Sequence, residues 1–108
     1  MRTLHTLLAT VLAYALCAQS ISTTDLHTFS PDLLVVESGT EIAITVGTGH
    51  TMTETTEATW NANDNTPNGG FHFDPGTHAL TLTLPGTYYF VCQPHAFMGM
   101  KGRIIVES

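Results

Sequence analysis

Three kinds of metal-binding side chain lie close together near the C-terminus. The stretch from Cys92 to Met100 reads CQPHAFMGM, so nine residues include a thiol, an imidazole and two thioethers, from Cys92, His95, Met98 and Met100. Thiolate, thioether and imidazole together suit copper, whereas magnesium and calcium prefer oxygen ligands. Zinc also binds cysteine and histidine, but a zinc site would leave the methionines without a role. The stretch therefore predicts a copper site.

The residues before this stretch have the pattern of a β-strand that ends at the cysteine. Tyr88, Phe90 and Cys92 share one parity of an extended run, so their side chains point to one face, which we expect to be buried. Pro94 has a fixed φ and no N–H, which favours a turn that brings His95 back toward the sulfur. We therefore expect the thiolate to lie inside the fold, shielded from water.

A second imidazole is needed for a blue-copper site, in which two histidines and a cysteine form a plane and a methionine binds weakly from one side. His50 is the best candidate, because it follows an expected strand, Glu41–Val46, and ends the glycine-rich turn Gly47–His50. A ligand so far upstream would connect the cysteine loop to the body of the fold. The spacing of donors alone leaves both Met98 and Met100 open as the axial ligand.

The segment GTYYFVCQPHAFMGMKGRIIV resembles the C-terminal signature of the cupredoxins, in the plastocyanin, pseudoazurin and amicyanin group. The family pattern Gly-x-Tyr-x-Phe/Tyr-x-Cys-x-Pro-His is matched at Gly86, Tyr88, Phe90, Cys92, Pro94 and His95. The upstream half is similar in Phe29-x-Pro31, Gly39 and a strand leading to His50. The resemblance covers most of the chain and implies one type 1 copper ion that alternates between Cu(I) and Cu(II).

The resemblance also favours one of the two methionines. In the family the axial methionine usually stands two residues before a glycine that leads into a basic residue and the last strand, and Met100-Lys101-Gly102-Arg103 has this arrangement. Met98 has the shorter spacing of the amicyanin type and is the alternative. The chain departs from plastocyanins at Thr51, where an asparagine often follows the first histidine, and at Val91, where an aromatic residue often precedes the cysteine.

The family resemblance implies a carrier of single electrons rather than an enzyme. Redox protein partners would dock weakly and transiently on an apolar patch at the edge of His95, with Phe97 and Met98 at its rim. A copper chaperone or storage protein is the alternative, since the same ligands would serve it with a more exposed metal. A copper oxidase or nitrite reductase would need further ligands and usually a second domain.

Residues 1–20 have the pattern of a signal peptide. Arg2 precedes an apolar stretch, Leu7–Ala18, which is too short to span a bilayer but long enough for a signal core, and we expect cleavage after Ser20. Lipid anchoring at Cys17 is the less favoured alternative, because no small residue directly precedes it. The protein is then exported, periplasmic or secreted. Cys92 is the one cysteine left after cleavage, which excludes an internal disulfide.

Residues 21–108 are expected to form one copper-binding domain without a transmembrane segment, an all-β Greek-key sandwich of the cupredoxin-like class. Short alternating runs separated by turns, such as Leu33–Glu37, Glu41–Val46, 80–84 and 104–107, indicate antiparallel-rich sheets. This segment contains two basic residues against nine acidic ones, so nucleic acid is not an expected partner. We expect a monomer.

Residues 51–76 are less regular, and we assign no chemistry to them. Residues 55–62 are expected to form a helical turn, and residues 61–70 a loop, with Trp60 and Phe71 as anchors. His72 and His78 are interpreted as surface or hydrogen-bonded imidazoles, because no soft donor flanks them. The role of this segment stays open.

Overall fold

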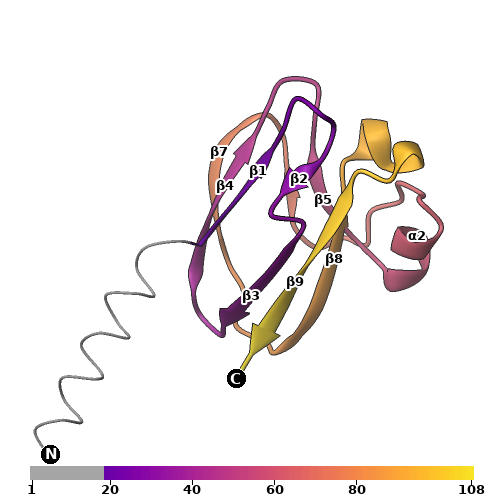
Figure 1. The fold of residues 1–108 in the computed structure, drawn as a ribbon. Helices are drawn as coiled ribbons and strands as arrows, with labels where there is room; N and C mark the ends of the chain where they lie inside the picture. Colours follow the sequence, from indigo (N-terminus) through magenta and orange to yellow (C-terminus); the bar gives the residue numbers. More distant parts are fainter. Residues whose placement is uncertain (1–18) are drawn as a thin grey trace, which may run out of the picture.

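The computed structural model describes residues 19–108, which fold into two packed β-sheets (Figure 1). The expected leader, including Cys17, lies outside the described residues except for Gln19 and Ser20. Ser20 begins the strand β1 (Ser20–Thr23), and just before it the Gln19 carbonyl accepts a hydrogen bond from the Ala43 amide at 2.9 Å. No helix in the described part of the chain is long and apolar enough to cross a membrane.

The first sheet has four strands in the order β2-β1-β4-β7. Its strands are β1 (Ser20–Thr23), β2 (Phe29–Ser30), β4 (Glu41–Val46) and β7 (Gly76–Thr81). β1 runs parallel to β4, and the other neighbours are antiparallel. On β4 the residues alternate between exposed and buried, and Ile42, Ile44 and Val46 face the core, as the sequence predicted.

The second sheet has five strands in the order β3-β9-β8-β5-β6. Its strands are β3 (Leu33–Glu37), β5 (Met52–Thr55), β6 (His72–Phe73), β8 (Gly86–Val91) and β9 (Lys101–Glu107). β3 pairs with β9 in parallel, and the other pairs are antiparallel. The two mixed sheets confirm the expected all-β sandwich.

The core lies between the sheets and includes the end of β8. Phe90 and Cys92 both belong to the buried core cluster, Tyr88 packs against it, and Val91 of the opposite parity does not belong to it, which confirms the expected common face. Phe29 packs edge-on against Phe90 with ring centroids 4.8 Å apart. Met52 and Met100 also belong to this core. The metal-binding stretch is therefore continuous with the packed interior.

One strand was misplaced by the sequence argument. The leucine–threonine alternation at residues 80–84 predicted a strand there, but β7 begins at Gly76 and ends at Thr81. The register explains the shift, because residues 76–81 pair with the whole of β4, and Leu84 lies beyond the pairing, 73% exposed. His78 consequently lies within β7 rather than before it.

The middle segment forms a short excursion beside β8. α2 (Glu57–Asn61) is capped by the Thr56 hydroxyl, which accepts from the Thr59 amide, and it lies next to β8 in Figure 1. The Trp60 indole N–H donates to the Gly102 carbonyl at 2.9 Å. This bond anchors the excursion to β9, as expected of Trp60.

Candidate metal centre

Two connections at one end of the sandwich carry the expected ligands. The link from β4 to β5 crosses from one sheet to the other and contains His50, whose amide donates to the Gly47 carbonyl at 3.1 Å. The link from β8 to β9 contains Cys92, the 3-10 helix η1 (Gln93–Met98) and Met100. The two turns therefore face each other across the end of the core.

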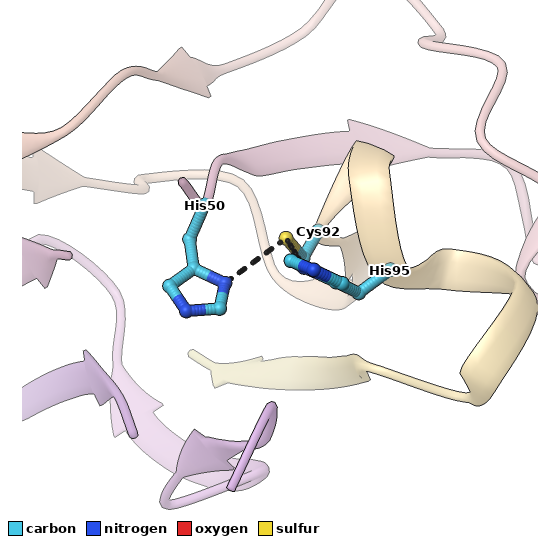
Figure 2. A group of neighbouring side chains, drawn as sticks. All are labelled: His50, Cys92 and His95. Carbon is cyan, nitrogen blue, oxygen red and sulfur yellow. Dashed lines mark hydrogen bonds between the residues drawn. The ribbon is translucent and has the colours of Figure 1, made fainter. Parts of the chain in front are cut away.

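Three donor atoms converge between these turns. The Nδ1 atoms of His50 and His95 lie 3.6 Å and 3.4 Å from the Cys92 sulfur, and the donor atoms of all three residues are within 4.8 Å of one another. Figure 2 shows His50 facing Cys92 and His95 from the opposite side. Metal–sulfur and metal–nitrogen bonds of about 2.3 Å and 2.0 Å span separations of this size. The donor set therefore fits one metal ion.

The turn at Pro94 has the form that the sequence predicted. Pro94 lies in the first turn of η1, where its missing N–H is not needed, and the His95 amide donates to the Cys92 carbonyl at 3.0 Å. Gly99 ends η1 in the left-handed region with φ 83°, which favours glycine. The chain then returns, and the Cys92 amide donates to the Met100 carbonyl at 3.0 Å.

Burial changes the pKa values of two donors. Burial raises the pKa of the Cys92 thiol, although backbone N–H groups of Thr51 and His95 partly oppose this by favouring the thiolate. Burial, followed by the neighbouring His95 and His27, lowers the pKa of His50, while Asp25 opposes the shift. In the absence of metal the site therefore favours a neutral thiol and a neutral imidazole at His50.

Thr51 joins the two ligand turns directly. Its amide donates to the Cys92 sulfur at 3.4 Å, and its hydroxyl oxygen accepts from the Gln93 amide at 2.9 Å. The asparagine that often follows the first histidine in plastocyanins is thus absent, but Thr51 still connects the two turns. Hydrogen bonds of this kind orient metal ligands and tune their electronic properties.

The two methionines have different environments. Met100 is 1% exposed, contacts His50 and belongs to the core, whereas Met98 is 56% exposed at the end of η1. A thioether must approach the donor cluster to act as a ligand. The burial difference thus agrees with the family spacing, which favours Met100.

A third imidazole, which the sequence did not predict, lies beside the site. The ring centroid of His27 lies 4.4 Å from that of His95 and 5.5 Å from that of His50. His27 has a positive φ of 59° in the turn between β1 and β2, which brings it over the ligands. A positive φ at histidine and this tertiary contact have no local sequence signal.

The other two histidines of residues 19–108 form hydrogen bonds with groups outside the donor cluster. His72 contacts the Thr53 hydroxyl at 2.8 Å through Nδ1 and the Asp74 carboxylate at 3.0 Å through Nε2. His78 Nε2 contacts the Asp74 carbonyl at 2.7 Å. Both agree with the interpretation as hydrogen-bonded imidazoles.

Known proteins resemble this chain at two levels. Chloroplastic plastocyanin from Oryza sativa subsp. indica is 56% identical over 34 residues, which are 31% of this chain and 22% of that protein. Chloroplastic plastocyanin from Hordeum vulgare is 58% identical over 34 residues, again 22% of its length. The chain thus matches less than a quarter of these relatives.

Solved structures agree over a longer span. The oxidized plastocyanin of Dryopteris crassirhizoma superposes with a TM-score of 0.59 and 24% identity, over 82% of this chain and 99% of that chain. A purple cupredoxin from Nitrosopumilus maritimus gives a TM-score of 0.65 at 16% identity, over 83% and 100%. These likenesses confirm the cupredoxin fold.

A sequence model of one family covers nearly the whole chain. It is described as copper binding proteins of the plastocyanin/azurin family, and it matches residues 15–107. The match includes both ligand turns and every strand of the two sheets. Together with the His-Cys-His cluster and the buried methionine beside it, this match shows that the chain belongs to the plastocyanin/azurin family of copper binding proteins.

Proposed function

We propose that the protein carries single electrons between redox partners, with one copper ion held by His50, Cys92, His95 and, axially, Met100. The convergence of two imidazole nitrogens on one fully buried sulfur is the observation that carries this proposal. Bound copper would supply a one-electron couple between Cu(I) and Cu(II). The protein provides the ligands and holds them in place through the strands on either side of the two ligand turns.

The chain's own residues keep this ligand set rigid. Cys92 is fixed by backbone bonds to Met100 and His95, and Thr51 bonds both the sulfur and the turn that follows it. A site that barely moves between oxidation states loses little energy to reorganisation. This property suits a carrier, whereas a delivery protein must open to release its metal.

The surface beside His95 supplies an exit for the electron. His95 is partly exposed, and Phe97 and Met98 next to it are 75% and 56% exposed. Large apolar side chains on a small exposed area favour brief contacts that exclude water between two proteins. We propose that redox partners dock here, and that the protein itself is a monomer.

Electron self-exchange between oxidised and reduced copies of the protein tests electron transfer and docking beside His95, and it requires no other protein. In the copper-loaded protein, NMR line broadening in Cu(I)/Cu(II) mixtures is expected to report exchange, and Phe97→Glu is expected to slow it by about tenfold through charge repulsion at the docking face. Leu84→Glu is the matched control, since Leu84 is 73% exposed and precedes β8, at the opposite end of this strand from Cys92. Equal slowing by both variants would refute docking at Phe97, and no exchange in wild type would favour a copper-handling function.

We further propose that residues 1–20 direct export and are removed, so that the protein works in a periplasmic or extracellular compartment. The support is the sequence pattern of residues 1–20. The mass of the mature protein isolated from its native source tests this, because an acylated Cys17 and a cut after Ser20 differ in mass. A full-length product in the cytoplasm would contradict the proposal.

A further inference from the structure

A second site of different chemistry lies behind the metal-binding loop. A cavity of about 340 Å³ is lined by the residues Asp32, Leu33, Trp60, Lys101 and Arg103, together with two glycines. Its volume is within the range of pockets that bind small molecules. None of these side chains belongs to the ligand cluster.

The cavity contains every cationic side chain of residues 19–108. Lys101 and Arg103 are the two basic residues of this part of the chain, which has nine acidic ones. Across the described residues the structure contains one ion pair, His72 with Asp74, so neither cation has a carboxylate partner. Two unneutralised cations at one cavity in an otherwise acidic protein create a local site for an anion.

The two cations are positioned by the same aromatic residue. Lys101 Nζ donates to the Trp60 carbonyl at 2.8 Å and lies 4.2 Å from the indole centroid, and the Arg103 guanidinium carbon lies 5.9 Å from it. The Arg103 side chain makes no hydrogen bond to another described residue, so its fork of N–H donors is free for a ligand. A guanidinium binds a carboxylate through two parallel hydrogen bonds.

The other lining residues limit what kind of anion would fit. Leu33 is 43% exposed at the cavity and offers an apolar surface, as does the edge of the indole. Asp32 has an exposed carboxylate at the same cavity, which leaves a net charge of one positive unit and disfavours a second negative charge on the ligand. The lining therefore matches one carboxylate attached to an apolar body.

We propose that this cavity binds a small organic monoanion, whose carboxylate contacts Arg103 and Lys101 and whose apolar part packs against Leu33 and Trp60. The site does not depend on bound copper. It adjoins the metal loop all the same, because Gly99 and Lys101, on either side of Met100, both line it.

Trp60 provides a direct measurement, since it is the one tryptophan of the chain and its indole N–H has one NMR signal. Titration of the purified protein with hexanoate is expected to shift this signal saturably, with a dissociation constant in the millimolar range, because one carboxylate and a short chain make few contacts. Arg103→Gln is expected to weaken binding by about tenfold, the usual effect of losing a charge-assisted hydrogen bond. 1-Hexanol, which lacks the charge, should not bind.

Asp32 provides a second test, in which removing a charge is expected to strengthen binding rather than weaken it. Succinate, a dianion, is expected to bind wild type more weakly than hexanoate, and Asp32→Asn should strengthen its binding severalfold. Glu37→Gln is the matched control, because it removes one negative charge five residues further along the chain, at the end of β3. The proposal is wrong if hexanoate gives no saturable shift, if Arg103→Gln binds hexanoate as wild type does, or if Glu37→Gln and Asp32→Asn have equal effects.

Discussion

Met100 is buried in the core at the end of the β8–β9 connection, and Met98 is exposed at the end of η1. A buried thioether beside two imidazoles favours the softer Cu(I), and a harder amide oxygen would favour Cu(II). Met100→Gln is therefore expected to keep copper bound, change the visible spectrum and lower the reduction potential by on the order of 60 mV, a tenfold change in relative affinity.

Met98→Gln serves as the matched control for this prediction, because it makes the same substitution two residues away on the surface. Its spectrum and potential are expected to equal those of wild type in cyclic voltammetry. The reverse pattern, with Met98→Gln altering the site and Met100→Gln leaving it unchanged, would overturn the axial assignment.

The buried thiol predicts how the metal-free protein responds to pH. Burial raises the pKa of Cys92 in the fold, so folding favours the protonated thiol. This contribution to stability is fully present below the pKa of the unfolded thiol and is lost as pH rises through the folded pKa. The free energy of unfolding of metal-free wild type should therefore fall with pH in the alkaline range more steeply than that of Cys92→Ser, measured by urea denaturation. Parallel curves for the two proteins would contradict the raised pKa.

At the scale of elements, the backbone of β9 at Gly102 packs directly against the Phe90 ring and the Asp32 backbone. A Cβ added at Gly102 would meet the Phe90 ring at 2.6 Å and the Asp32 carbonyl oxygen at 2.8 Å. The backbone atom has little freedom to move, and overpacking of this kind costs about 1–3 kcal/mol. Gly102→Ala is thus expected to lower the free energy of unfolding by about this amount in urea denaturation. If the variant were as stable as wild type, β3 and β9 would be able to move apart with no loss in the free energy of unfolding.

Sequence periodicity located β4 well, misplaced β7 and missed β5. β4 was predicted with its correct bounds, because three branched apolar residues on one face leave one register. β5 was missed, since Thr53 and Thr55 are buried polar residues whose hydroxyls bond His72 and the Thr66 carbonyl. Threonines in a strand of this kind look like loop residues until their hydrogen-bond partners are known.

The candidate site was more predictable than the sheet around it. Cys92, His95 and Met100 lie on one short connection, so local spacing alone brings them close. His50 could be proposed because it ends a clear strand in a glycine turn. His27 could not, because its place above His95 results from β1 pairing with β4 and from a positive φ. Tertiary contacts of this kind leave no periodic trace in the sequence.

At the scale of the whole molecule, the metal would join the link that crosses between the sheets to the β8–β9 connection. His50 lies on the crossing from β4 to β5, and the other ligands lie on the connection from β8 to β9. A metal ion bound by the folded state alone stabilises that state by mass action, by about 2.7 kcal/mol at a hundredfold excess over its dissociation constant. For a domain of this size that corresponds to a rise in Tm of about 10–20 °C.

Thermal unfolding with and without one equivalent of copper measures this effect. His50→Ala is the informative variant, because it leaves the β8–β9 connection intact and removes the ligand on the β4–β5 crossing. Its Tm is expected to rise less than that of wild type on copper addition. An equal rise would mean that copper stabilises the fold without binding His50.

The central claim is that a buried thiolate and two imidazoles bind copper as a type 1 site. Its most direct test is to add one equivalent of Cu(II) to the purified protein and record visible absorption and electron paramagnetic resonance. The account predicts an intense thiolate-to-copper absorption band with a narrow copper hyperfine splitting, both lost in Cys92→Ser. A colourless protein with an ordinary tetragonal copper signal, from folded wild type, would contradict it.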